Sequence, residues 1–162
     1  FSDRDIAYVP IQPPIGGLVR PTDICFGFDE LLYVVDEGTE EVICFDESGN
    51  EIARKFVQGA RSVSQDRRFD LLVIGTRTDS IAGVEYDLSC IYRLRLFDEN
   101  GYGLDRASVI SEIVHPFYFK STFSSGDALV QFHKIGVIGD NFNPDKNNAF
   151  YVTRTGPSSN NA

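Results

Sequence analysis

The sequence predicts an all-β protein built from repeated sets of short antiparallel strands. Three apolar runs follow one another at residues 23–28, 31–36 and 41–46, and each is rich in Ile, Val, Tyr, Phe and Cys. Residues of these types favour a pleated, largely buried surface. Polar turn residues separate the runs, and a similar order of runs and turns returns further along the chain.

The main internal repeat matches the segment 21–37 to the segment 60–76 without a gap. The matching apolar positions are Ile24 with Val63, Leu32 with Leu71 and Val34 with Val73. The segment 45–49 matches 97–101 at a larger shift, so we expect Phe45 and Phe97 to be equivalent. We place the extra residues in a loop insertion at 77–89, because its composition is mostly polar.

A third and fainter copy follows, with a first strand at 132–140 and a second at 149–154. Residues 107–114 fit a strand or one helical turn. We favour a strand, because residues 51–56 (EIARKF) hold the equivalent place after the third strand of the first copy.

Repeated units of three or four antiparallel strands, with almost no helix, are typical of β-propeller blades. The predicted fold is therefore an incomplete β-propeller of about three four-stranded antiparallel blades. We divide the chain into a Pro/Gly-rich lead-in at 1–19, a first blade at 20–58 and a second blade at 59–112. A lead-in and a truncated third blade occupy 113–162. The chain contains no Met and its C-terminus falls among turn residues directly after a strand-like run, so we expect a piece of a longer protein.

Residues 20–50 resemble an NHL repeat, a family of β-propeller blades. The residues that carry the resemblance are Pro21, Asp23, Ile24, Gly27, Leu32, Tyr33, Val34, Asp36, Val42, Phe45, Asp46 and Gly49. The second blade departs from the pattern, with Ala60 and Gly75 in place of the Pro and of the Asp after the second strand. In style the first blade is similar to extracellular and lipoprotein-type propellers of Bacteroidota, which implies an extracytoplasmic or cell-surface location.

The charge balance argues against nucleic-acid binding as the main activity. Lys and Arg number 15 against 24 Asp and Glu, a net charge of -9, whereas phosphate binding needs clustered basic residues. Four arginines gather in the second blade, but the first blade is acidic; they are Arg61, Arg67, Arg68 and Arg77. The longest apolar run is 71–74, far below the roughly 20 residues of a membrane span.

Three cysteines with irregular spacing predict neither a disulfide framework nor a metal site. Cys25 and Cys44 lie inside apolar runs and Cys90 lies further on, so we expect buried free thiols. His115 and His133 have no partners at metal-ligand spacing, which favours structural roles. Neither a catalytic nor a cofactor-binding residue is predicted.

A polar stretch at 140–148 alternates oxygen donors like a calcium loop. Lys146 takes the place of the required Gly, however, and Val152 that of the bidentate Glu, so a hairpin turn is favoured.

Two functions remain open. The leading hypothesis is a non-enzymatic binding or scaffold module that works with other protein chains of a larger assembly, without a cofactor. The alternative, implied by the NHL resemblance, is a metal-dependent lyase or hydrolase with its site in the propeller channel. Asp23, Ser62 and His133 fall near equivalent inner positions for such a site.

Overall fold

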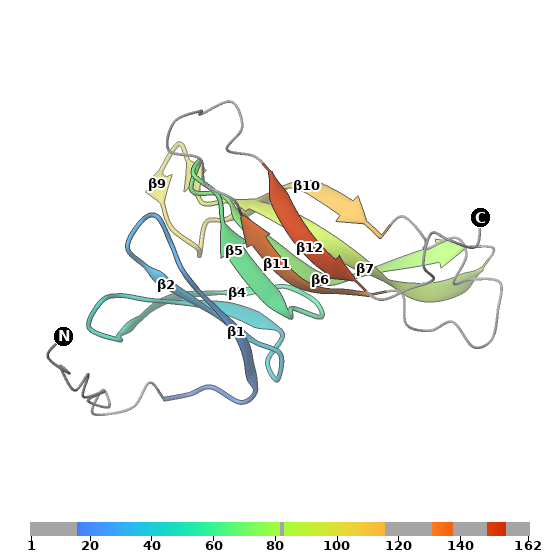
Figure 1. Cartoon of the computed structure of the whole chain (residues 1–162), viewed down its shortest axis with the longest axis horizontal. Coiled ribbons are helices and arrows are strands. Elements are labelled where there is room, and N and C mark those ends of the chain that lie inside the picture. The colour runs from blue at the N-terminus through green and yellow to red at the C-terminus, as the bar shows by residue number, and fades with distance from the viewer. Residues whose placement is uncertain (1–15, 82, 116–130, 138–148, 155–162) are drawn as a thin grey trace, which may run out of the picture.

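The computed structural model describes residues 16–81, 83–115, 131–137 and 149–154. Across these residues the chain forms strands and turns and no helix, which confirms the all-β prediction (Figure 1). The strands form several antiparallel sheets, and none of the sheets is closed. The described residues contain no helix that could cross a membrane.

The first sheet follows the predicted strands closely, and its strand order is β1-β2-β3-β4. Its strands are β1 (Pro21–Phe26), β2 (Leu32–Asp36), β3 (Glu41–Phe45) and β4 (Glu51–Phe56). Tight turns join them because short polar residues cap the exposed backbone. At the β3–β4 turn Asp46 Oδ1 accepts hydrogen bonds from Ser48 N at 2.9 Å and Asn50 N at 2.8 Å.

The second sheet has the order β10-β7-β6-β5. Its strands are β5 (Ser62–Gln65), β6 (Leu71–Ile81), β7 (Val84–Arg95) and β10 (Ser108–Val114). The strand expected at 107–114 is therefore present as β10. The connection between β7 and β10 contains a small hairpin of β8 (Phe97–Asp98) and β9 (Gly101–Tyr102). A third sheet pairs β11 (Phe132–Val137) with β12 (Phe150–Arg154).

The first two strands of the two large sheets pair in matching register. Ile24 pairs with Val34 in the first sheet. Val63 pairs with Val73 in the second sheet, and these are the positions that the internal repeat makes equivalent. The turns after these first strands match as well. In the first sheet Gly27 N donates a hydrogen bond to Leu31 O at 2.8 Å. At the equivalent positions of the second sheet, Asp66 N donates to the backbone oxygen of Asp70 at 2.9 Å.

The segment 77–89, predicted as a loop, is instead part of a long hairpin. The β6–β7 ladder continues from Leu71↔Leu94 to Ile81↔Val84 and reaches away from the rest of the molecule (Figure 1). Apart from the buried Leu88, the described side chains of this segment are partly or fully exposed, so its polar composition reflects a solvent-exposed hairpin rather than a loop. Cross-strand contacts hold the hairpin, among them Thr78 Oγ1 donating to Asp87 Oδ1 at 2.8 Å.

The predicted equivalence of Phe45 and Phe97 is also wrong. Leu32 pairs with Phe45 in the first sheet, whereas its counterpart Leu71 pairs with Leu94 in the second. Phe45 is 2% exposed and Phe97 is 65% exposed. The sequence similarity between 45–49 and 97–101 reflects similar turns instead. Asp98 Oδ1 accepts a hydrogen bond from the backbone N–H two residues later, as Asp46 Oδ1 does in its own turn.

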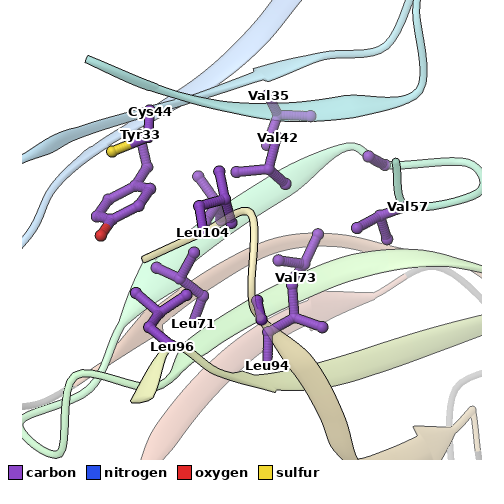
Figure 2. Close-up of a cluster of buried hydrophobic side chains, with 13 residues drawn as sticks. Tyr33, Val35, Val42, Cys44, Val57, Leu71, Val73, Leu94, Leu96 and Leu104 are labelled. Atoms are coloured by element: carbon purple, nitrogen blue, oxygen red, sulfur yellow. The ribbon is translucent and has the colours of Figure 1, made fainter. Parts of the chain in front are cut away.

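The three sheets pack face to face through apolar clusters. Figure 2 shows the larger cluster, in which one face of the first sheet meets the second sheet and the β7–β10 connection. Its buried members are Tyr33, Val35, Val42, Cys44, Val57, Ala60, Val63, Leu71, Val73, Leu94, Leu96, Leu104 and Ala107. A second cluster joins the opposite face of the second sheet to the third sheet through Leu72, Ile74, Ile91, Phe132 and Ile135. The first strands β1, β5 and β11 are consecutive neighbours in space.

The cysteines are free, and two of the three are buried. Cys44 and Cys90 lie in the interior as expected, whereas Cys25 on β1 is only half-buried. Burial raises the pKa of the Cys44 thiol to about 12 and that of Cys90 to about 11.

Candidate functional site

Four aromatic side chains gather where the turns of the two large sheets meet, and we call them the aromatic surface. They are Phe28, Phe69, Phe97 and Tyr102, with exposed fractions of 46%, 42%, 65% and 40%. Phe28 lies in the β1–β2 turn and Phe69 in the β5–β6 turn, while the other two come from the β8–β9 hairpin. Exposed aromatic side chains brought together from separate segments are typical of a binding surface.

The turn that carries Phe69 holds it in an unusual backbone conformation. Phe69 has φ +63°, in the left-handed region that a bulky residue rarely adopts. The turn is held by Asp66, whose Oδ1 accepts from Arg68 N at 2.8 Å and from Asp70 N at 3.0 Å. This network places the Phe69 ring outward, edge-on to Tyr102, with ring centroids 6.3 Å apart and planes at 86°.

Two adjacent cavities open on the aromatic surface, and they share Phe69 and Tyr102. The first has a volume of about 300 Å³ and is lined by Phe28, Asp29, Glu30, Phe69 and Tyr102. The second has a volume of about 360 Å³ and is lined by Arg68, Phe69, Asp70, Arg95, Phe97 and Tyr102. Both volumes lie in the range that accommodates a few side chains or a small molecule.

Under the aromatic surface lies a polar network centred on Asp29. Its Oδ2 accepts hydrogen bonds from Tyr33 Oη at 2.5 Å, from Gln65 Nε2 at 2.8 Å and from Tyr102 Oη. Gln65 Oε1 in turn accepts from Phe28 N at 2.6 Å. Because this network links the β1–β2 turn, β5 and β9, it fixes the aromatic side chains relative to one another.

The tyrosines of this network act as hydrogen-bond donors. Burial, together with the hydrogen bond to the Asp29 carboxylate, raises the pKa of both Tyr33 and Tyr102 far above the usual tyrosine range. Both phenols therefore stay protonated at any physiological pH. In this arrangement both phenols donate to the Asp29 carboxylate beneath the aromatic surface.

Gly27 is required at the edge of this network. A Cβ at this position would meet Asp29 Oδ1 and would lie 2.6 Å from Gln65 Oε1 and 3.0 Å from a ring carbon of Tyr33. Only a residue without a side chain allows the turn to approach so closely.

The four arginines singled out from the sequence separate into two groups. Arg61 and Arg77 lie away from the aromatic surface, in ion pairs with Glu37 at 3.8 Å and with Asp79 at 2.9 Å. Arg67 and Arg68 belong to the β5–β6 turn. The Arg67 guanidinium carbon lies 4.9 Å from the centre of the Phe28 ring, which is a cation–π contact.

Of the three residues expected at equivalent inner positions, Asp23 and Ser62 lie in contact and His133 does not join them. Ser62 Oγ donates to Asp23 Oδ2, and Val63 N donates to the same oxygen at 3.1 Å. The third member is Lys134 rather than His133, because a register shift follows Phe132 in β11. Lys134 Nζ lies 2.8 Å from Asp23 Oδ1, and we call Asp23, Ser62 and Lys134 the inner-strand cluster.

The two histidines lie apart from these groups. His115 is buried, its ring centroid is 4.7 Å from that of Phe132, and desolvation lowers its pKa. His133 is exposed on β11. Among the residues that the structure describes, His, Cys, Asp and Glu form no group of three or more that could hold a metal. The possible calcium loop at 140–148 lies outside the described residues.

Sequence reasoning missed the aromatic surface. Phe28 and Phe69 each stand within a polar turn, next to Asp29-Glu30 and Arg67-Arg68. A large aromatic residue inside a tight turn was the available signal, because such a side chain has little access to the core.

Comparisons of the chain with protein-family models, curated proteins and solved structures gave no match.

Proposed function

We propose that this chain is a β-propeller-type binding module that presents the aromatic surface to another protein chain of a larger assembly. The observation that carries the proposal is the aromatic surface itself. Four exposed rings from two sheets and a hairpin stand over a floor fixed by Asp29 and its hydrogen-bond donors. A preorganised aromatic patch loses little conformational entropy when it binds a partner.

The propeller interpretation is supported by how the three sheets follow one another. Corresponding residues pair in each sheet, since Ile135 pairs with Val152 as Ile24 pairs with Val34. The sheets pack face to face in sequence order, and their first strands are successive neighbours. Blades of a propeller are related in this way, and the NHL resemblance of residues 20–50 adds to the support.

The inner-strand cluster supports a structural role more than a catalytic one. Ser62 is fully buried; its Oγ donates to Asp23 and accepts from Ile135 N at 3.1 Å. The hydroxyl is therefore engaged on both sides, by the first sheet and by the third. The alternative hypothesis, a lyase or hydrolase in the channel, would need side chains turned toward a substrate at this place.

The test is affinity isolation of the full-length protein from its native source, with partner chains identified and bound metals quantified. The wild type is compared with a Phe69→Gly/Phe97→Ser variant. Phe69→Gly suits the left-handed backbone, so this variant removes two rings without adding strain. The matched control is Val109→Ser/Ile113→Ser, which removes two apolar side chains of 50% and 43% exposure from β10.

We expect a stoichiometric partner with the wild type and with the control, and its loss with the ring variant. A partner retained by the ring variant contradicts the proposed surface. A protein isolated alone, with a bound metal ion in stoichiometric amount, supports the enzyme hypothesis instead.

A further inference from the structure

The second cavity of the aromatic surface is basic, although the chain as a whole carries a net charge of -9. Four arginines surround the β5–β6 turn, namely Arg67, Arg68, Arg93 and Arg95, against the two acids Asp66 and Asp70. A local excess of positive charge on an acidic protein attracts anions to that place alone.

Both carboxylates, Asp66 and Asp70, are buried and accept hydrogen bonds from Arg93. Asp66 and Asp70 are 2% and 4% exposed. Arg93 donates to both, through Nη2 to Asp66 and through Nε to Asp70 at 2.9 Å. Arg93 and Arg95 together offset these two carboxylates, because Arg95 also lies at ion-pair distance from Asp70, and Arg67 and Arg68 supply the local excess of positive charge. The exposed guanidinium groups that line the cavity are those of Arg68 and Arg95.

Arg68 and Arg95 line the cavity of about 360 Å³ from exposed positions. The Arg95 side chain is 55% exposed, and its Nε lies 3.8 Å from Asp70 Oδ1, which is an ion-pair distance but too long for a hydrogen bond. Its planar guanidinium can therefore turn donors toward a carboxylate in the cavity, with a gain from the paired N–H groups.

The remaining lining residues of this cavity are mostly aromatic. Phe69, Phe97 and Tyr102 lie beside the two arginines, so the cavity offers apolar contact next to positive charge. The adjoining cavity differs, because Asp29 and Glu30 line it and no basic residue does. An anion is therefore favoured in the second cavity and repelled from the first.

We propose that the aromatic surface binds an acidic peptide segment of the partner, with a Glu or Asp side chain placed between Arg68 and Arg95. The neighbouring aromatic or aliphatic residue of that segment packs on Phe69, Phe97 and Tyr102. This assignment rests on the proposed function and specifies the chemistry of its partner. Charge complementarity in the second cavity is the observation that selects an acidic ligand.

The direct test is calorimetric titration of the full chain with three end-blocked synthetic hexapeptides. One alternates tyrosine with glutamate, the second tyrosine with glutamine and the third tyrosine with lysine. We expect the glutamate peptide to bind about tenfold more tightly than the glutamine peptide, a difference of about 1.4 kcal/mol. Binding of the lysine peptide should be the weakest, and the preference for glutamate should shrink as salt is raised.

Three variants locate the effect. Arg68→Gln and Arg95→Gln should each lower affinity for the glutamate peptide several-fold, and the double variant should bind the glutamate and glutamine peptides equally. The matched control is Arg77→Gln, because Arg77 is a partly exposed arginine on the distant β6–β7 hairpin. It should leave all affinities unchanged.

Equal binding of the glutamate and glutamine peptides by the wild type overturns the acidic-ligand assignment but leaves the binding-module proposal standing. Binding of a glucuronate oligosaccharide in place of every peptide also overturns the assignment. A third outcome is that no peptide binds, although the Phe69→Gly/Phe97→Ser variant still fails to isolate the native partner. In that case the assignment of an acidic peptide ligand is wrong, and the aromatic surface remains the proposed binding site.

Discussion

Phe69 in the β5–β6 turn has the same left-handed backbone conformation as Glu30 in the β1–β2 turn, with φ of +63° and +64°. The two residues are equivalent in the internal repeat, and their N–H groups donate to the oxygens of Asp66 and Gly27 at 2.9 Å and 3.2 Å. One turn geometry thus carries an acidic residue in the first sheet and an exposed aromatic ring in the second. This difference in side chains on a common backbone places Phe69 in the aromatic surface.

The strain at Phe69 predicts an unusual order of substitution effects. Phe69→Val should destabilise the protein by about 1–2 kcal/mol, because a β-branched residue is disfavoured at positive φ. Phe69→Gly should stay within about 1 kcal/mol of the wild type, because relief of backbone strain offsets the lost ring contact with Tyr102. Urea unfolding of the three proteins measures the order, and equal destabilisation by both variants would contradict it.

Gly27→Ala should disrupt the network that supports the aromatic surface. The added methyl group would meet Asp29 Oδ1 and Gln65 Oε1, so we expect a loss of about 2–4 kcal/mol in the free energy of unfolding. Gly16→Ala is the matched control, because no atom lies within 4 Å of a Cβ at that position. Thermal or urea unfolding of both variants checks the prediction, and a fully stable Gly27→Ala protein would refute the close approach.

Ser62 is predicted to join the three sheets. Ser62→Ala removes the acceptor for Ile135 N and the donor to Asp23, so it should destabilise the protein by about 1–3 kcal/mol. Asp23→Ala should be costly as well, since it also loses Val63 N and the ion pair with Lys134. A double-mutant cycle should give a coupling of at least about 0.5 kcal/mol, whereas strict additivity would show that the two side chains act separately.

We expect the ionised carboxylate of Asp36 to stabilise the folded protein at neutral pH and to lose this effect in acid. Its burial opposes ionisation, but backbone N–H groups of Val19 at 2.6 Å, Arg20 at 2.8 Å and Gly38 at 2.9 Å lower its pKa overall. Because the folded-state pKa is below that of the unfolded chain, this stabilisation is present above about pH 4. It is lost as pH falls through the lowered pKa.

Asp36→Asn should therefore be less stable than the wild type at pH 7, with a difference that narrows as the solution is made strongly acidic. Urea unfolding measured at several pH values tests this expectation. A constant difference between the two proteins over that range would mean that the carboxylate charge contributes nothing.

Much of the first sheet could be read from the chain because its cues are local. Short apolar runs and Asx or Gly turns specify β1 to β4 without distant information. The second sheet was predicted less well. The polarity of the 77–89 segment predicts a loop, but cross-strand pairs such as Thr78 with Asp87 stabilise a solvent-exposed hairpin there.

The inner-strand cluster shows a different limit. Asp23 and Ser62 could be matched through the internal repeat, but the third position could not. A register shift after Phe132 places Lys134, and not His133, at the inner position beside Asp23. A shift of one residue in a strand reverses which side chains face inward.

The amino-acid sequence alone was enough to predict the all-β class and the strands of the first sheet, and its internal repeat predicted the matching turns of the second sheet. These features follow from side-chain propensity and backbone capping, which act between residues close in the chain. The folded structure was needed to show that Leu71 pairs with Leu94 and not with Phe97. It was also needed to show that Phe97 lies at the surface with Phe28, Phe69 and Tyr102. Burial and charge pairing depend on neighbours from other sheets, and those neighbours are chosen by packing and register rather than by local pattern.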